Sequence, residues 1–360
     1  MKKKIALIFG GRSAEHEVSI NSAKNIFKAI DLKVFEPILL GVSKQGSWYR
    51  FTSSDVFEKF KSLNDSDLKK EEAITLISFE EKPFIFSLRT QEKTAIDAAF
   101  PIIHGTMGED GTLQGYFKIL NLPFVGCGVL ASAISMDKEY MKRVMTEANI
   151  PNSKYLVLHQ SEATSFQDIS KKLGLPFFIK PANAGSSVGV HKIKSEADFK
   201  TKIQDSFLYD RKVIAEEFIQ GREIECSVLG LNLKSRASLP GELVVHHEFY
   251  SYEAKYIDAD GAEIVIPAHL TATQIQQIQQ MAVQTFDTLF CDGFARVDFF
   301  LRPDGQVYVN EINTLPGFTK ISMYPKMWEA SGLKYTDLIT KLIELSFEKH
   351  HLDNQIKLSF

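Results

Sequence analysis

The 360-residue sequence contains few cysteines, and no two of them are close in sequence. Cys127, Cys226 and Cys291 form no Cys-x-x-Cys pattern, which excludes a disulfide framework and gives no indication of a zinc site. Because unpaired cysteines are typical of a reducing compartment, the sequence predicts a cytoplasmic protein.

An excess of positive charge and a long apolar run are also missing. Lys plus Arg number 42 and Asp plus Glu number 45, a net charge of −3, whereas nucleic-acid-binding proteins are typically basic. The uncharged stretch 119–136 is interrupted by Asn121, Pro123 and two glycines, so we expect no membrane span. The length allows two or three domains with a cleft between them. These features favour chemistry on a small molecule, with no nucleic-acid or membrane partner.

Apolar runs that lead into glycine recur in the first third of the chain. They lie at 5–9, 95–103 and 124–125, and a helical pattern follows the first of them. This arrangement predicts an α/β domain with parallel strands at 1–126, in which the polar segment 53–72 is a surface insertion. Shorter strands and polar helices predict a smaller α+β domain at 127–215 and a third domain at 216–360.

The segment 295–313 has the pattern of a β-hairpin, with Asp-Gly at its turn. Antiparallel pairing around this turn places Arg302 opposite Val307 and therefore Asp298 opposite Glu311. Two carboxylates opposite each other weaken a sheet unless a positive charge lies between them.

The same register places Arg296 opposite Asn313, on the face that carries the two carboxylates. Asp298, Glu311 and Asn313 offer oxygen ligands, the donor set of a hard cation, so the pattern predicts a Mg²⁺ site whose remaining ligands are water and substrate phosphates. The alternative is a solvated hairpin face on which Arg296 alone neutralises the two carboxylates.

A glycine- and serine-rich loop at 185–189 follows a strand that carries Lys180. Its backbone N–H groups and hydroxyls can bind an anion, and the lysine can add a charge for a phosphate. The loop lacks the Walker A spacing, and an ordinary turn is the alternative.

A second glycine pattern, Gly-x-Gly-x-x-Ala at 126–131, is typical of dinucleotide-binding domains and makes a nicotinamide-dependent oxidoreductase the main rival. The acidic residue expected about twenty positions further on would be Glu147, but it falls within a helical pattern and not at the end of a strand. A nucleotide-binding protein without catalytic activity is the third interpretation.

Seven segments, taken together and in their order, resemble the motifs of the D-alanine:D-alanine ligase family of the ATP-grasp superfamily. They lie at 10–19, 104–115, 135–138, 180–189, 252–256, 296–298 and 310–317. The resemblance implies an α/β, partly α+β, three-domain ATP-grasp architecture: an N-terminal substrate domain with a parallel sheet, a small central domain, and a C-terminal domain with the metal site. It also implies ATP-dependent joining of two D-alanines through an acyl phosphate, for the peptidoglycan precursor. The implied partners are D-alanine, ATP and Mg²⁺, which Mn²⁺ can replace, and a second copy of the chain bound through the N-terminal domain.

By the same resemblance, the ATP site combines phosphate-binding lysines with an adenine-binding strand end and a ribose-binding carboxylate. Without the family, the strand end would be an ordinary one. The implied phosphate ligands are Lys138, Lys180 and Lys255; the adenine segment is Glu216, Glu217, Phe218 and Ile219; the ribose ligand is Glu223.

The resemblance also assigns the substrate and catalytic residues. Glu15 receives the ammonium of the first D-alanine, although a helix cap is the alternative for a carboxylate at that place. Ser186 and Tyr256 link to Glu15 and close a loop over the site; by composition alone, 249–266 would be a surface loop. Tyr256 favours a dipeptide product, because relatives that make D-alanyl-D-lactate lack this tyrosine. The remaining assignments are Arg296 and the Gly317 N–H as oxyanion donors, His104 near the first substrate, Ser322 and Met323 on the second substrate's carboxylate, and Asp298, Glu311 and Asn313 on the metal.

Overall fold

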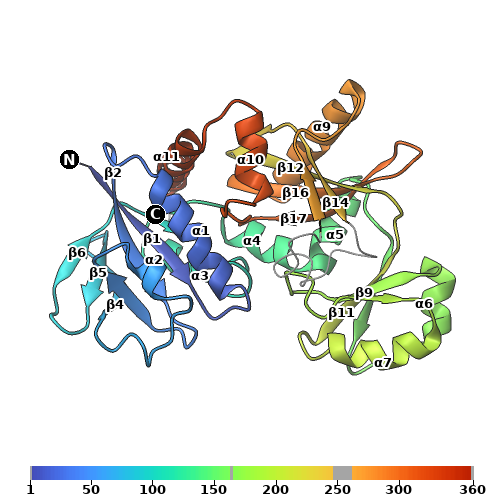
Figure 1. The fold of residues 1–360 in the computed structure, drawn as a ribbon, viewed down its shortest axis with the longest axis horizontal. Coiled ribbons are helices and arrows are strands. Elements are labelled where there is room, and N and C mark those ends of the chain that lie inside the picture. Colours follow the sequence, from blue (N-terminus) through green and yellow to red (C-terminus); the bar gives the residue numbers. More distant parts are fainter. Residues whose placement is uncertain (1, 163–164, 246–261, 358–360) are drawn as a thin grey trace.

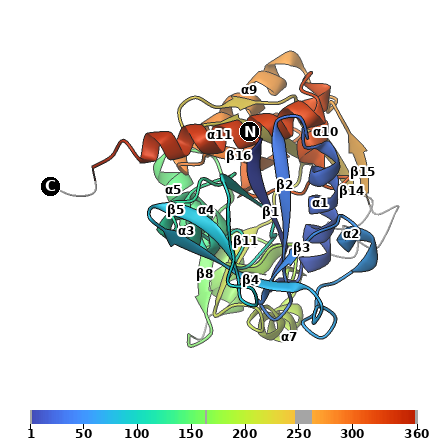
Figure 2. The same cartoon turned by 90° about the vertical axis from the view of Figure 1, so that its left-hand side faces the viewer.

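The computed structural model describes residues 2–162, 165–245 and 262–357, which form three β-sheets with their covering helices (Figures 1 and 2). The strand orders are β6-β5-β4-β3-β2-β1-β7, β10-β9-β11-β8 and β15-β14-β12-β16-β17, with β13 paired to β12. In Figure 1 the first sheet lies at the left, the second at the lower right and the third at the upper right. The predicted mixed α/β class is confirmed.

Continuous apolar runs build the parallel part of the first sheet, because parallel strands are buried on both faces. β1 (Lys3–Gly10) pairs in parallel with β2 (Phe35–Val42) and β7 (Ala98–Pro101). Helix α1 (His16–Ala29) covers one face and α3 (Thr112–Ile119) the other. The sheet then continues with antiparallel strands, which are β3 (Trp48–Phe51), β4 (Glu72–Phe79), β5 (Lys82–Ser87) and β6 (Lys93–Ala95).

The prediction of a surface insertion at 53–72 is only partly confirmed, because most of the segment is exposed or half-buried but four of its apolar side chains enter the core. This segment contains α2 (Val56–Lys59), and Leu63 and Leu68 are fully buried in the same core as β1. The Phe57 ring lies 5.1 Å from the ring of Phe9, centroid to centroid. The apolar residues of this segment are separated by charged ones. Its overall composition is therefore polar and did not indicate that these apolar side chains are buried.

The second sheet is antiparallel throughout and has a core of its own, which includes Phe177 and Phe199. Two helices cover it, and the side chains of Ser165 and Ser195 cap their N-termini. The strands are β8 (Tyr155–His159), β9 (Phe177–Pro181), β10 (His191–Ile193) and β11 (Lys212–Glu217), and the helices are α6 (Phe166–Leu173) and α7 (Glu196–Ser206).

The third sheet carries the predicted hairpin. Its strands are β12 (Arg222–Gly230), β13 (Arg236–Ala237), β14 (Gly241–Val245), β15 (Ala262–Val265), β16 (Gly293–Leu301) and β17 (Val307–Asn313). Its helices are α9 (Ala272–Thr288), α10 (Met323–Ala330) and α11 (Tyr335–Asp353). Residues of α11 also enter the core beneath β1, so the C-terminal helix joins the first and third sheets (Figure 2).

Helices α4 (Val129–Met136) and α5 (Lys138–Glu147) pack on the third sheet, since Met141 and Met145 are fully buried in its core. The domain limits at 126 and 215 stay a prediction. Part of the loop expected at 249–266 is strand β15, and the rest lies outside the described residues. No helix in the part of the chain that the structure describes is long and apolar enough to cross a membrane.

Candidate active site

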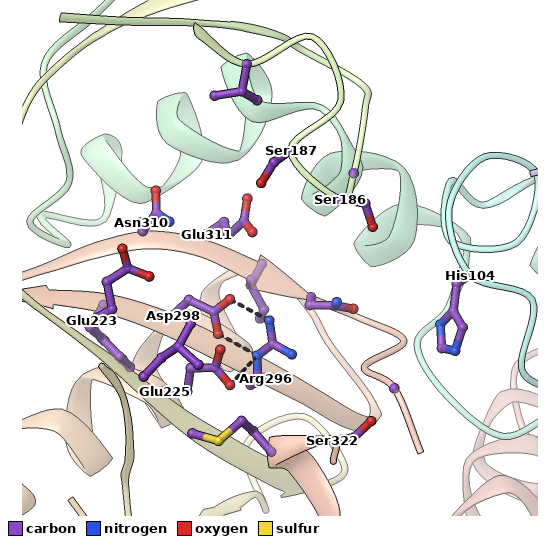
Figure 3. Close-up of a pocket in the computed structure, with 18 of the residues that line it drawn as sticks. His104, Ser186, Ser187, Glu223, Glu225, Arg296, Asp298, Asn310, Glu311 and Ser322 are labelled. Atoms are coloured by element: carbon purple, nitrogen blue, oxygen red, sulfur yellow. Dashed lines mark hydrogen bonds and ion pairs between the residues drawn. The ribbon is translucent and has the colours of Figure 1, made fainter. Parts of the chain in front are cut away.

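A large cavity of about 1230 Å³ lies where the three sheets meet. Every predicted site residue within the described ranges lines it, and Figure 3 shows part of its wall. Two predicted residues, Lys255 and Tyr256, lie outside the described residues. The residues that line the cavity as predicted are Glu15, His104, Lys138, Lys180, Ser186, Glu216, Glu217, Phe218, Ile219, Glu223, Arg296, Asp298, Glu311, Asn313, Gly317, Ser322 and Met323.

The hairpin of β16 and β17 has the predicted pairing at its functional end. Asp298 lies opposite Glu311, and Arg296 lies opposite Asn313. All four side chains line the cavity, so they share the face that the register predicted.

The predicted pairing of Arg302 with Val307 is wrong, because Leu301 occupies that place. The turn is therefore one residue out of the expected register. A β-bulge between Asp298 and Phe299 restores it, and Asn310 is the extra residue on β17. The bulge also turns Asn310 into the cavity wall beside Glu311 (Figure 3).

Arg296 lies between two carboxylates in this wall (Figure 3). Its Nε and Nη2 donate to the two oxygens of Asp298, each at 2.7 Å, and Nε lies 3.0 Å from Oε2 of Glu225. Burial lowers the pKa of Arg296, but Asp298 and Glu225 outweigh it and raise the pKa well above its ordinary value. The sequence did not identify Glu225 as a site residue. The only indication was its position two residues after Glu223, which places both side chains on the same face of β12.

The donor set of the hairpin fits a hard divalent cation. Asp298 and Glu311 supply carboxylates from neighbouring strands, and Asn313 adds an amide oxygen, which also accepts a hydrogen bond of 2.9 Å from the Leu315 N–H. Among the described residues, no group of three or more His, Cys, Asp or Glu side chains is arranged to hold a metal. Two carboxylates and an amide suit Mg²⁺, which keeps water and phosphate oxygens among its ligands.

A buried ion cluster lies at the other side of the cavity, between α5, β9 and β11. Glu216 contacts Lys180 Nζ at 2.6 Å and Lys142 Nζ at 3.0 Å, and Lys142 also donates to Ser153 Oγ at 2.9 Å. Burial raises the pKa of Glu216, but the two ammonium groups outweigh it and hold the pKa below the ordinary 4.5. Burial also lowers the pKa of Lys142.

The sequence did not reveal Lys142. Its signal was the spacing of four residues from Lys138, which places both lysines on one face of α5. Lys138 Nζ donates to the backbone oxygen of Ala184 at 2.7 Å, at the start of the glycine- and serine-rich loop. The two lysines thus hold different parts of the same cavity wall.

Glu15 lies where the turn after β1 leads into α1. It occupies the N-cap position of α1, as the alternative predicted, but its side chain makes no capping hydrogen bond to the helix. Instead, the Ser186 hydroxyl donates to Glu15 Oε1. Gly105, at φ +76°, lies so close that a Cβ there would be 2.9 Å from Glu15 Oε2. The carboxylate is therefore fixed between the first sheet and the loop of the second.

His104 is buried and bridges two segments that are distant in sequence. Its Nδ1 lies 3.0 Å from the Leu315 oxygen, and its Nε2 lies 3.0 Å from Ser22 Oγ, which also accepts a hydrogen bond of 3.2 Å from the Phe318 N–H. Burial lowers the pKa of His104, but Glu109, 3.4 Å away, outweighs it and raises the pKa. This network holds the segment that contains Gly317.

We predict that Ser22→Ala lowers the free energy of unfolding by about 1–3 kcal/mol, because the buried Phe318 N–H loses its acceptor. Urea unfolding would measure the change. Ser346→Ala is a matched control. That buried hydroxyl donates to a carbonyl of its own helix, so its removal leaves no N–H group without an acceptor. A Ser22→Ala loss no larger than that of the control would contradict the prediction.

The glycine pattern at 126–131 does not line the cavity. It follows an isolated bridge between Ala99 and Phe124, not a full strand, and Glu147 ends helix α5. The Gly126 oxygen accepts a hydrogen bond of 2.9 Å from Lys349, which packs this segment against α11. The fingerprint of the oxidoreductase interpretation therefore lies outside the cavity that the predicted site residues line.

Comparison with protein families identifies two matching models. The model described as "D-ala D-ala ligase N-terminus" matches residues 4–127, and the model described as "D-ala D-ala ligase C-terminus" matches residues 144–344. Together they cover most of the chain, including both sides of the cavity.

Individual relatives match the chain over its whole length. The chain is 50% identical to a D-alanine–D-alanine ligase of Oceanobacillus iheyensis, over 100% of this chain and 99% of the relative. Among solved structures, the D-alanine–D-alanine ligase of Coxiella burnetii superposes with a TM-score of 0.87 at 38% identity, covering 98% of this chain and 96% of the other. The VanG D-Ala:D-Ser ligase of Enterococcus faecalis has a TM-score of 0.86 at 35% identity, covering 96% and 100%.

Proposed function

The chain belongs to the D-alanine–D-alanine ligase family, and from this premise we propose that its cavity joins two D-alanines into D-alanyl-D-alanine at the expense of ATP. The product supplies the peptidoglycan precursor. The observation that carries the proposal is the convergence of the predicted residues on one cavity, with Arg296 between carboxylates on one wall and Lys138 and Lys180 on the other.

On the nucleotide side, Lys138 and Lys180 bind the phosphates, and Glu223 binds the ribose. Glu216, Glu217, Phe218 and Ile219 form the adenine-binding segment. Asp298, Glu311 and Asn313 hold Mg²⁺, or Mn²⁺ in its place. When bound, the cation neutralises charge on the phosphate oxygens.

In the first step, an oxygen of the first D-alanine's carboxylate attacks the γ-phosphorus of ATP, and the bond to the ADP oxygen breaks. Glu15 holds the substrate's ammonium, and His104 lies beside the substrate. Lys180 offsets the charge of the transferring phosphoryl group, because phosphoryl transfer depends chiefly on positioning and charge neutralisation.

In the second step, the amine of the second D-alanine attacks the carbonyl carbon of the acyl phosphate. The Arg296 guanidinium and the Gly317 N–H donate to the developing oxyanion, phosphate leaves, and the nitrogen loses its proton. Ser322 and Met323 hold the acceptor's carboxylate end.

Water must be excluded because an acyl phosphate hydrolyses readily. The hydrogen bond from Ser186 to Glu15 supports closure from the side of the second sheet. We assign Tyr256 to the same link and Lys255 to a phosphate, in the segment beyond the described residues.

We also propose a cellular location and an oligomeric state for the enzyme. We place it in the cytoplasm, where its nucleotide is available, and propose a homodimer formed through the N-terminal domain. The three buried, unpaired cysteines agree with a reducing compartment.

Incubation with ATP, Mg²⁺ and D-alanine tests the proposal directly. We expect ADP and D-alanyl-D-alanine in equal amounts, and less product when D-serine or D-lactate is offered as the acceptor. ADP release that does not depend on D-alanine would contradict the ligase, and preference for D-serine would contradict the acceptor assignment. NADH binding without ADP release would favour the oxidoreductase.

Glu311→Gln should lower the turnover number at least about a hundredfold at limiting Mg²⁺, because it removes a charged ligand from the metal site. Folding should change little, since the substitution also removes repulsion between Glu311 and Asp298. Steady-state rates across a Mg²⁺ titration, with thermal unfolding of both proteins, would measure this. A Glu311→Gln variant that turns over as fast as the wild type at low Mg²⁺ would contradict the assignment of Glu311 to the metal site.

A further inference from the structure

Three carboxylates lie abreast on three neighbouring strands of the third sheet. Glu225 on β12 is paired with Asp298 on β16, and Asp298 is paired with Glu311 on β17. All three line the cavity, and Arg296 is the guanidinium among them (Figure 3).

Arg296 contacts its two carboxylates in different ways. Asp298 receives two parallel hydrogen bonds of 2.7 Å, whereas Glu225 places its Oε2 3.0 Å from Nε of the guanidinium. The proposed metal site needs an oxygen of Asp298. A divalent cation that binds one of these oxygens places further positive charge beside the guanidinium and weakens the hydrogen bonds of the carboxylate to Arg296, so metal binding and the Arg296–Asp298 pair compete.

When the metal binds Asp298, the Arg296 guanidinium needs a second counter-charge. The side chains of Arg296, Asp298 and Glu225 are only 19%, 14% and 11% exposed. Leaving a buried charge without its partner is strongly unfavourable. Of these two carboxylates, Glu225 is the one that is not a proposed ligand.

We propose that Glu225 is a positioning residue that holds Arg296 in place and neutralises it while Asp298 binds the metal. Asp298 is then the exchangeable partner of Arg296, and Glu225 is the constant one. The inference rests on the proposed function, since it concerns the oxyanion donor and the metal ligands of that reaction.

Glu225 itself is unsuited to join the metal ligands. It is two strands away from Glu311, which corresponds to a separation of about 9–10 Å between backbones. Its side chain instead lies beside the Arg296 guanidinium, on the opposite side of Asp298 from Glu311 (Figure 3). Its effect on the metal must therefore pass through Arg296.

The test is Glu225→Gln, which keeps the shape of the side chain and removes its charge. Without that charge, Arg296 should hold Asp298 more firmly and oppose the cation. We expect the affinity for Mn²⁺, measured by electron paramagnetic resonance with a non-hydrolysable ATP analogue, to fall about tenfold. The Mg²⁺ concentration for half-maximal turnover should rise by the same factor. Unchanged Mn²⁺ binding would overturn the proposal.

Glu242→Gln is the matched control for a purely structural loss. Glu242 is also a buried carboxylate of the cavity wall, and it accepts two hydrogen bonds from Arg222, at 2.7 and 2.6 Å. Both variants should lower the melting temperature, but only Glu225→Gln should weaken Mn²⁺ binding. An equal loss of Mn²⁺ affinity in the two variants would overturn the proposal.

A double-mutant cycle separates this role from a general effect of negative charge. With Arg296→Ala as the background, Glu225→Gln should change Mn²⁺ affinity by less than about twofold, because its intermediary is gone. A tenfold loss that persists in that background would overturn the proposal. If Glu225→Gln does not fold, Glu225→Asp replaces it in both backgrounds: the shorter side chain withdraws from Arg296, and Mn²⁺ affinity unchanged from the wild type would again overturn it.

These outcomes are distinct from a failure of the proposed function. A wild-type protein that releases no ADP with D-alanine contradicts the ligase itself, whatever the variants do. An active wild-type enzyme whose Glu225→Gln variant binds Mn²⁺ normally contradicts only the role of Glu225.

Discussion

Replacing Arg296 by alanine should lower the turnover number by about 10²–10³, the usual effect of losing one oxyanion donor. The same substitution should tighten Mn²⁺ binding, because Asp298 loses the guanidinium that holds both its oxygens. Opposite effects on catalysis and on metal affinity distinguish an oxyanion donor from a simple structural counter-ion. Single-turnover rates and electron paramagnetic resonance of bound Mn²⁺ would measure the two effects.

Arg222→Ala is the control, since Arg222 also forms a bidentate pair with a buried glutamate and lines the same cavity. It should lose stability without the large fall in turnover. Arg296→Ala with a turnover within about threefold of the wild type would show that Gly317 alone suffices for the oxyanion, and would remove Arg296 from catalysis.

The hairpin shows how much of the site the sequence could predict. Alternation of side chains and the Asp-Gly turn predicted Asp298 opposite Glu311, and the structure has this pairing. The β-bulge at Asn310 could not be predicted, because it depends on how β17 packs against its neighbours and not on a local sequence signal. The pairing at the site was correct because the bulge compensated for a turn register that was wrong by one residue.

Residues that act on other site residues were harder to predict than those that face the substrates. Glu225, Lys142 and Ser22 each contact a residue that the family resemblance had identified, but no motif contains them. Their partners come from other strands or helices: β16 for Glu225, β11 for Lys142, and the segments holding His104 and Phe318 for Ser22. Such contacts depend on the tertiary fold, which a single sequence does not specify residue by residue.

Whether a segment is buried or exposed, and whether it is a strand or a loop, was hardest to predict where apolar residues are sparse. The segment 53–72 is polar in composition, yet its Leu63 and Leu68 complete the core beneath β1. Strand β15 likewise lies in a stretch that its composition assigned to a loop. In both cases pairing and burial against another segment decided the structure, whereas strongly periodic segments such as α1 formed as predicted.

Glu216→Gln should have the largest effect on stability, a loss of about 3–5 kcal/mol in the free energy of unfolding at neutral pH. The substitution leaves the ammonium groups of Lys142 and Lys180 buried on either side of a neutral amide. Lys142→Met is the matched control. It removes one charge of the same cluster but leaves the 2.6 Å pair of Lys180 with Glu216, so its loss should be smaller. Urea unfolding would rank the two variants, and an equal or reversed order would contradict the prediction.

The pH dependence of the same variant provides an independent check, with a sign that follows from the two pKa shifts. In the wild type, the pKa of Glu216 is held below 4.5, so its contribution to stability is present above that pH and is lost as the pH falls further. The Glu216→Gln variant has no such contribution to lose. The substitution should instead lower the pKa of Lys142 further, so that the folded state releases a proton which the unfolded state keeps up to about pH 10.5. The stability of the variant should therefore rise more than that of the wild type as the pH increases from 7 toward 10.5, and a deficit that stays constant over this range would show that Lys142 does not depend on Glu216 for its charge.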